Sequence, residues 1–552
     1  MQTHEPAALG SKPAAPEASN PAVEVSSAPV LRATAFPSLV GKALLGVAHV
    51  QTAIWDRAAK RVEQEQERAL AELVAHARGT EFGRAHGFER IRRYADFARQ
   101  VPIGDYDSFS PYIERMRKGE RGLVVPEFIR YYGNSSGSSN QGRQKFLPIG
   151  ERQISYQKKA GADALMRYLA HKGDARYPTG YTLGLFPPIT MRAEGPVLIT
   201  SNPALMVTRM PKFTAPMYLP HDEIKRVPEY ERRLGIIAER YLDYDVRSIT
   251  GTTCWFTLML QKVIEAARRR GRSVSTVREI WPNLKVMLGG GVSADPYLPI
   301  LERLMGTSDF TLVDTYNATE GGLFAATDFT GAPGMLMIPH RGTFFEFVPM
   351  DERDKPNPTR VPLWGVERDR LYSILVTTVS GLYAYEIGDI VRFPSIAPHR
   401  IEFAGRTAGC LSVTQELTTH IEIEQAVAYA IKQVPCRTLD FGAAADVGVA
   451  GTAKSRYVLY AEFDASAEPK SLEQLAAAFD EGLGKLNRVY REHRAGDVAI
   501  LPPIVVALAR GGAQRFLHEV TNGNVQGKFP RILSEARREK LLAYIRQDPT
   551  VS

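Results

Sequence analysis

From Arg57 to Ala77, apolar residues recur every three or four positions, which is the spacing of one face of an α-helix. Gly79 follows this stretch and favours a helix end there. The preceding segment, Val40–Trp55, is strongly apolar but contains Lys42 and His49, and it is shorter than the ~20 residues that a membrane span needs. We therefore expect helices packed on the protein surface and no membrane span.

Further along the chain, short apolar or β-branched runs alternate with helical patterns. These runs are TLGLF at 182–186, LKVML at 284–288, FTLVD at 310–314 and FFEFV at 344–348. Strands that alternate with helices are typical of an α/β fold. The sequence therefore predicts a large α/β domain that contains β-sheet and packed helices.

The pattern restarts after about Leu417. A helical run comes first, then a strand at Tyr457–Phe463, then a helix whose start carries the capping-box pair Ser471 and Gln474. This order of elements predicts a smaller C-terminal α+β domain, reached through a hinge near residues 412–422.

The first 37 residues differ in composition from the rest of the chain. They are rich in Ala, Pro, Ser and Glu, and no cationic start is followed by an apolar stretch, so residues 1–37 are expected to be a disordered tail and not a signal peptide. A chain of 552 residues is also longer than one hydrophobic core usually supports. We place the large domain at residues 38–417 and the small, mobile domain at residues 418–552.

Charge and cysteine content exclude several classes of partner. The net charge of +8 is small beside 69 basic and 61 acidic side chains, which are spread along the chain, so a nucleic-acid-binding stripe is not indicated. The three cysteines, Cys254, Cys410 and Cys436, lie far apart and lack the spacing of metal ligands. We expect a cytoplasmic protein without a nucleic-acid partner.

A Gly/Ser-rich stretch, YYGNSSGSSNQGRQKFLP at 131–148, is the first candidate for chemistry. Gly137 and Gly142 have the spacing of a Walker phosphate loop, but that motif continues with Lys and Ser or Thr, and this chain has Arg143 and Gln144. Without the Walker motif, the stretch is a Ser/Gly-rich loop followed by Lys145. Such a loop either binds phosphate through hydroxyls, backbone N–H groups and the lysine, or is a solvated turn.

The stretch LKVMLGGGVSADPYLP suggests a different nucleotide site. Gly289, Gly291 and Ala294 fit the pattern G-x-G-x-x-A after a strand, and Asp314 follows about twenty residues later, as in dinucleotide-binding folds. However, Asp295–Pro296 is a natural helix start, which places the helix after the glycines and not among them. A nicotinamide-dependent dehydrogenase is therefore a remote alternative.

The strand that ends near Asp314 runs into TYNATEGG at 315–322. There, Tyr316 could stack on a base, Thr319 could contact a phosphate and Glu320 could hold a magnesium ion. The alternative is a polar turn with a packed tyrosine.

Three further stretches each carry one candidate residue. Asp389 lies in GLYAYEIGDIVRF, and its carboxylate could accept both hydroxyls of a ribose, although Gly388–Asp389 alone would suggest a hairpin turn. Arg406 lies in EFAGRTAGCLSV and Lys528 in GNVQGKFPRIL. Taken alone, each of these two cations would be a solvated surface residue.

Taken together and in this order, the motifs resemble the adenylate-forming superfamily. They are most similar to the auxin-responsive Gretchen Hagen family of acyl-acid amido synthetases and its bacterial members. Further segments resemble that family in the expected places, from about Trp55 to the C-terminus: RGTEFGRAHGF at 78–88, VPIGDYDSFSPYIERMRKGE at 101–120, IWPNLKVMLGGG at 280–291, GTFFEFVP at 342–349 and QGKFPR at 526–531.

The resemblance implies a role for each candidate residue. Ser135, Ser136, Ser138, Ser139 and Lys145 would form the phosphate loop, Tyr316, Thr319 and Glu320 the adenine and magnesium motif, Asp389 the ribose contact, Arg406 a contact near the hinge, and Lys528 the catalytic lysine. Ser138 stands where the family usually has threonine, and Asn140–Gln141 makes the loop one residue longer. After Ser412, the sequence VTQELTTH replaces the acidic, lysine-containing run of the plant members.

The implied activity uses ATP and Mg²⁺ to convert a carboxylic acid into an acyl-adenylate, and then transfers the acyl group to an amine, usually an amino acid. A wall of the acid pocket is expected in TGTTCWFTLML at 250–260, with Thr252, Trp255 and Phe256 as candidates; alternatively, these residues belong to the core of a helix. An acyl-CoA ligase and a non-catalytic adenylate-binding homologue remain alternative functions.

Overall fold

A computed structural model of the protein describes residues 38–547 with short gaps. The gaps are residues 136–144, 187–188, 211–213, 228–229, 291–297, 354, 407–410, 412–417, 447–448, 450–454, 488–489, 492–493, 496–499 and 521–528.

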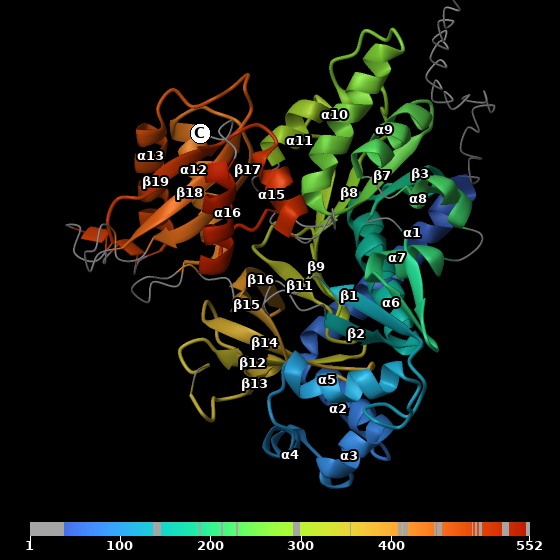
Figure 1. The fold of residues 1–552 in the computed structure, drawn as a ribbon. Coiled ribbons are helices and arrows are strands. Elements are labelled where there is room, and N and C mark those ends of the chain that lie inside the picture. The colour runs from blue at the N-terminus through green and yellow to red at the C-terminus, as the bar shows by residue number, and fades with distance from the viewer. Residues whose placement is uncertain are drawn as a thin grey trace, which may run out of the picture.

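A twelve-stranded sheet runs through the large domain (Figure 1) in the order β13-β12-β14-β15-β16-β11-β10-β9-β8-β7-β3-β6. Its strands are β3 (Tyr181–Leu185), β6 (Tyr218–Leu219), β7 (Val246–Gly251), β8 (Val286–Gly290), β9 (Thr311–Ala318), β10 (Gly322–Ala326), β11 (Met335–Met337), β12 (Thr343–Pro349), β13 (Val361–Pro362), β14 (Leu371–Thr378), β15 (Tyr385–Ile396) and β16 (His399–Arg406). Neighbours from β6 to β9 are parallel, and those from β9 to β13 are antiparallel. The four strands predicted from apolar runs are β3, β8, β9 and β12.

Helices cover both faces of the parallel half of this sheet. Val286 of β8 and Val313 of β9 pack with residues of α1 (Ser38–Lys60) and α6 (Glu151–Lys172), whereas Met287 of β8 packs with residues of α10 (Thr253–Arg269). Neighbouring residues of a strand point to opposite faces. Burial on both faces therefore explains why these strands are continuous apolar runs. The other helices of this half are α7 (Asn202–Thr208), α8 (Asp222–Lys225), α9 (Tyr230–Arg240) and α11 (Leu298–Met305).

The antiparallel half shares a core with helices from the N-terminal part of the chain. These are α2 (Val62–Ala77), α3 (Glu81–Ala85), α4 (Tyr94–Gln100) and α5 (Tyr106–Arg117). The helix predicted from Arg57 to Ala77 is confirmed except at Arg61, which has the non-helical angles φ −122° and ψ 40° and separates α1 from α2. The apolar spacing continues across this break because both helices are buried, α1 against α6 and α2 against β12.

A second sheet of four strands carries the Gly/Ser-rich stretch. Its order is β2-β1-β5-β4, with β1 (Tyr131–Ser135), β2 (Lys145–Ile149), β4 (Met191–Glu194) and β5 (Val197–Thr200). β1 and β2 form an antiparallel hairpin, and α6 begins directly after β2.

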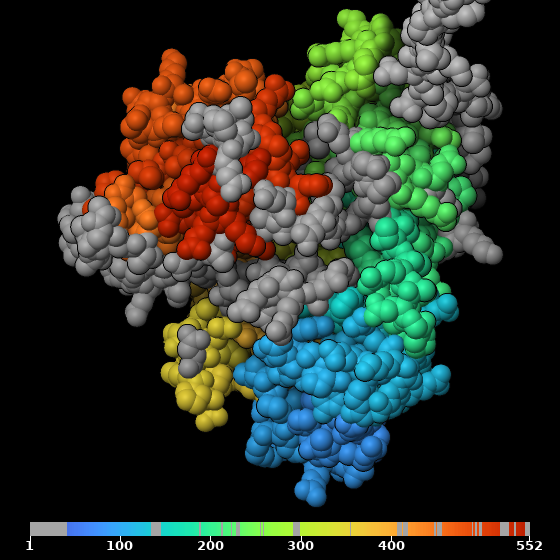
Figure 2. All heavy atoms as spheres, viewed as in Figure 1, coloured from blue at the N-terminus to red at the C-terminus, as the bar shows by residue number. Residues whose placement is uncertain are grey.

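The C-terminal elements form a sheet and a core of their own, drawn in orange and red in Figures 1 and 2. The sheet contains β17 (Thr438–Asp446), β18 (Arg456–Phe463) and β19 (Ile504–Leu508), with helices α12 (His420–Gln433), α13 (Leu472–Leu486), α15 (Gly512–Val520) and α16 (Glu535–Gln547). The predicted strand at Tyr457–Phe463 is β18, and Ser471 caps α13 by accepting the backbone N–H of Gln474. An α/β body with a smaller C-terminal α+β unit is thus confirmed. No helix among the described residues is long and apolar enough to cross a membrane.

Candidate active site

The predicted phosphate loop lies between β1 and β2. Ser135 and Lys145 face each other across these two strands. The loop itself lies outside the described residues, as does the side chain of Ser135. This gap includes the predicted phosphate contacts Ser136, Ser138 and Ser139 and the extra pair Asn140–Gln141.

Lys145, at the base of the turn, lies beside the start of α5. Its Nζ atom is 5.7 Å from the centre of the Tyr106 ring, and the Tyr106 hydroxyl accepts the backbone N–H of Phe146 at 3.0 Å. Tyr106 is the first residue of α5, which begins with a capping box of Asp105 and Ser108. A well-defined helix start therefore holds the base of the hairpin.

The hairpin packs against the turn that follows β9. A Cβ atom at Gly133 of β1 would lie 2.6 Å from Cγ2 of Thr319, which is too close for any residue other than glycine unless Thr319 moves. The backbone oxygen of Thr319 accepts a hydrogen bond from Nε2 of Gln153, at 2.9 Å. The structure therefore brings Thr319 and the phosphate hairpin together.

The predicted adenine and ribose residues also meet. The Tyr316 hydroxyl donates to Oδ2 of Asp389 at 2.9 Å, although the two residues lie 73 positions apart. Both side chains are buried, with 6% and 3% of their surface exposed, and the Tyr316 ring packs edge-on against Phe324. Asp389 lies inside β15, after Gly388 with φ 87°, and not in a hairpin turn. Tyr316 is also a packed tyrosine, as its alternative interpretation predicts.

Glu320 lies partly exposed in the turn between β9 and β10. Burial is the main cause that raises the pKa of Tyr385, and the negative charge of Glu320 adds to it. Mg²⁺ is usually held by one or two carboxylates together with substrate phosphates. A single carboxylate near the hairpin that is predicted to bind phosphate fits that requirement. In the part of the chain that is described, no group of three His, Cys, Asp or Glu side chains could hold a metal alone.

Arg406 is the last residue of β16 and is paired with Asp389 across the ladder, so its backbone lies at the proposed ribose site. Its side chain is not among those described.

Lys528 also lies outside the described residues, but the residues that follow it are firmly anchored. Phe529 is 1% exposed. Arg531 donates from Nε to Glu424 of α12 at 3.1 Å and from Nη1 to the backbone oxygen of Phe441 in β17 at 2.7 Å. The attachment point of the lysine is therefore fixed to the C-terminal unit.

The three candidates for the acid pocket lie at the start of α10, where β7 ends. Thr252 is the residue before the helix and is partly exposed, as is Trp255. Phe256 is fully buried in the core that surrounds α10. Thr252 and Trp255 are therefore the two candidates that a ligand could reach without opening the core.

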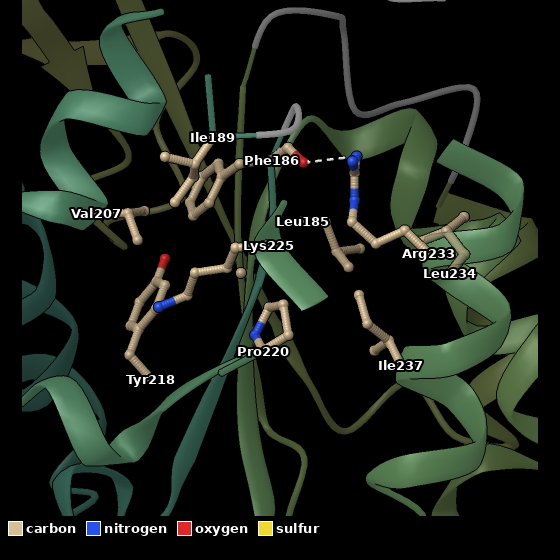
Figure 3. Close-up of a pocket in the computed structure, with 11 residues that line it drawn as sticks. Leu185, Phe186, Ile189, Val207, Tyr218, Pro220, Lys225, Arg233, Leu234 and Ile237 are labelled. Atoms are coloured by element: carbon tan, nitrogen blue, oxygen red, sulfur yellow. Dashed lines mark hydrogen bonds between the residues drawn. The ribbon is translucent and has the colours of Figure 1, made fainter. Parts of the chain in front are cut away.

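A small cavity lies nearby, at the end of β3 (Figure 3). Phe186, Val207 and Tyr218 line one side of it and Ile237 of α9 the other, and Arg233 closes one end by donating to the backbone oxygen of Phe186 at 3.0 Å. Its volume of about 20 Å³ has room for little more than one water molecule. In this conformation, the cavity is too small to hold even a small carboxylic acid.

Some residues that position the site escape sequence reasoning. Gly133 is visible only as one glycine of a Gly/Ser-rich stretch, and Gln153 and Ser380 belong to none of the motifs. Their contacts join segments far apart in the chain, so no local pattern could reveal them.

Three family models match the chain in succession. They are the GH3 family N-terminal domain at residues 53–225, the GH3 family central domain at 335–406 and the GH3 family C-terminal domain at 421–537. The chain belongs to the GH3 family. This confirms the family resemblance, and the GH3 central domain ends at Arg406, the last residue of β16.

Curated GH3 relatives match most of the chain. An indole-3-acetic acid-amido synthetase, GH3.8, of Oryza sativa subsp. indica is 24% identical over 83% of this chain and 85% of its own length. A second indole-3-acetic acid-amido synthetase, GH3.3 of Arabidopsis thaliana, is 23% identical over 86% of this chain and 90% of its own length.

Solved structures support the same fold. GH3.15 acyl acid amido synthetase superposes with a TM-score of 0.73 at 17% identity, covering 95% of this chain and 98% of its own. A 2-hydroxyisobutyryl-CoA ligase, solved with an acyl-adenylate in the postadenylation state, gives a TM-score of 0.52 at 14% identity, covering 94% of this chain and 93% of its own.

Proposed function

We propose that this GH3 protein is an ATP-dependent acyl-acid amido synthetase. The proposal rests on one observation: three segments that are far apart in the chain meet at one place. The phosphate hairpin meets Thr319 through Gly133, and the same strand end meets Asp389 through Tyr316. Membership of the GH3 family, with relatives named as amido synthetases, supports this activity.

The first step would activate the acid. A carboxylate oxygen attacks the α-phosphorus of ATP, a new P–O bond forms, and the bond to the β-phosphate breaks, so that pyrophosphate leaves. Asp389 and Tyr316 would hold the nucleoside, and Lys145, Thr319 and the serines of the hairpin turn would hold the phosphates. Glu320 would hold Mg²⁺, which supplies positive charge to the phosphates.

The charge that develops on the α-phosphate explains the need for cations. Lys528 and Arg406 would stabilise that charge where water is excluded, and removing one such group typically costs ~100-fold or more in rate. In the second step, the amine nitrogen attacks the acyl carbon, the bond to AMP breaks, and the amine loses a proton. We propose an amino acid as the acceptor, and Thr252 and Trp255 as contacts of the acid.

Acid-dependent exchange of pyrophosphate into ATP tests this function. The parent protein should catalyse exchange with at least one member of a panel of carboxylic acids. Lys528→Ala and Glu320→Ala should each reduce exchange by at least ~100-fold, because the first removes a positive side chain and the second removes the proposed ligand of Mg²⁺. Lys540→Ala, which changes an exposed lysine of α16, should leave the rate unchanged.

The acceptor is identified by product analysis of the same reaction with amino acids and with coenzyme A. Formation of an amide supports the proposal, whereas formation of a thioester alone would favour an acyl-CoA ligase. Failure of exchange with every acid would favour a non-catalytic homologue. Full exchange in Lys528→Ala would contradict the role of that lysine.

A further inference from the structure

The side chain of Gln153 connects three segments of the active site. It lies in the first turn of α6, directly after the phosphate hairpin, and is 1% exposed. Its Nε2 donates to the backbone oxygen of Thr319 at 2.9 Å, and its Oε1 accepts the hydroxyl proton of Ser380. Ser380 in turn accepts the backbone N–H of Gly150 at 2.9 Å. One amide thus joins residues that are 166 and 227 positions away in the chain.

Each partner belongs to a different part of the proposed site. Thr319 is the residue before Glu320 and packs against Gly133 of the phosphate hairpin. Gly150 joins β2 of that hairpin to α6. Ser380, which is fully buried, lies in the turn that leads from β14 to β15, the strand that carries Asp389.

The two bonds of Ser380 are buried, and the bond from Gln153 to Thr319 is part-buried. A buried polar group that loses its partner keeps the penalty of desolvation, so a substitution of Gln153 leaves the Ser380 hydroxyl without its acceptor and removes the bond that holds the Thr319 oxygen. The turn that carries Thr319 and Glu320 would then shift until these groups find other partners. A shift of about 1 Å in groups that orient a substrate can cost ~100-fold in rate.

We propose that Gln153 is a positioning residue for adenylation. It sets the distance between the phosphate hairpin and the turn of Thr319 and Glu320, and it links both to the segment that leads to the ribose-binding strand. This role rests on the proposed function, because it concerns the same site. Gln153 itself touches neither the nucleotide nor the acid.

The test compares two buried glutamines. Gln153→Met keeps the volume of the side chain but removes both hydrogen bonds. Gln66→Met is the matched control: Gln66 is also fully buried, donates to the backbone oxygens of Pro339 and Thr343 and accepts the backbone N–H of Phe345, so its bonds join α2 to β12 and do not hold Thr319. Both variants should lose stability. Only Gln153→Met should lose function per folded molecule.

Two measurements separate positioning from a structural role. In pyrophosphate exchange, Gln153→Met should lower kcat by ~10-fold to ~100-fold and leave the KM for the acid unchanged. In calorimetry with AMP and no metal, Gln153→Met should weaken binding by ~10-fold, because the contact of Thr319 with the phosphate is misplaced. Gln66→Met should match the parent in both.

Ser380→Ala provides a second, milder variant, because it leaves the bond between Gln153 and Thr319 intact. It should lower kcat by less than Gln153→Met does. Groups in one hydrogen-bond network give non-additive effects, so the double variant should be no slower than Gln153→Met alone.

The outcomes distinguish this role from the proposed function. Parent-like kcat and AMP affinity in folded Gln153→Met would contradict the positioning role and leave the function intact. Additive losses in the double variant would contradict the shared network. A parent protein without exchange contradicts the proposed function, and the AMP measurement then still decides whether Gln153 orders the nucleotide site.

Discussion

At the scale of single residues, the contact between Gly133 and Thr319 is the sharpest constraint in the site. A methyl group at position 133 would lie 2.6 Å from Cγ2 of Thr319 and 3.1 Å from Cδ1 of Ile149. We expect Gly133→Ala to push Thr319 away from the hairpin and to lower pyrophosphate exchange by ~10-fold or more, because orienting groups tolerate little displacement.

The same contact offers its own control. Thr319→Ser removes the Cγ2 methyl group that Gly133→Ala meets, and it keeps the hydroxyl proposed to contact a phosphate. The double variant Gly133→Ala with Thr319→Ser should therefore recover most of the lost exchange rate. A double variant as slow as Gly133→Ala alone would show that the damage arises elsewhere, for example at Ile149.

At the scale of elements, the segment that follows Lys528 is hydrogen-bonded to β17. The backbone of Ala443 donates to the oxygen of Arg531 and accepts the N–H of Leu533, both at 2.8 Å. A Cβ atom at Gly442 would lie 2.2 Å from the backbone oxygen of Pro530. We expect Gly442→Ala to detach this segment from β17 and to reduce exchange by at least ~10-fold, because Lys528, the proposed catalytic lysine, directly precedes the segment.

Gly484 of α13 is a suitable comparison in the same unit. A Cβ atom there meets only the Arg491 side chain, at 3.9 Å. Gly484→Ala should therefore leave exchange unchanged, and the gain in helix propensity should favour stability. Equal losses in the two variants would show that exchange responds to general destabilisation of the C-terminal unit.

At the scale of the whole molecule, three histidines make stability depend on pH. Burial lowers the pKa of His399 from 6.5 to about 4, and burial is also the main cause that lowers the pKa values of His171 and His221. Below pH 6.5 the unfolded chain binds protons that the folded chain does not, so stability is full above pH 6.5 and falls as the pH drops toward 4. For His399 alone, the loss at pH 5.5 is on the order of 1 kcal/mol.

Chemical denaturation at pH 7.5 and pH 5.5 measures this loss. His399→Gln cannot titrate, so the difference in unfolding free energy between the two pH values should be smaller in the variant by about 1 kcal/mol. An identical pH dependence in parent and variant would mean that His399 takes up its proton in the folded state near its usual pKa.

Much of the molecule was predictable because its large features have local causes. Strands such as β8 and β9 are apolar on both faces since helices cover both, and that pattern is visible in the sequence. The family resemblance rests on several motifs in order and is confirmed by the three GH3 family models. The break at Arg61 was missed because the apolar spacing continues through it.

The candidate site was predictable only in part. Tyr316 and Asp389 were singled out, and the structure brings them into contact. The bonds of Gln153 could not be predicted, because a buried glutamine in a helix has the same local sequence whatever it contacts. The roles of Ser136, Ser138, Ser139 and Lys528 stay predictions, since these residues lie outside the described part of the chain.

The two ends of the twelve-stranded sheet are its shortest strands. β6 and β13 contain two residues each, β13 includes Pro362, and Pro220 follows β6 directly. Proline has no N–H group to donate, and a two-residue edge offers very few unpaired backbone groups. A sheet of this width would otherwise invite a strand from another molecule to extend it. Because both edge strands are so short, the sheet resists edge-to-edge aggregation.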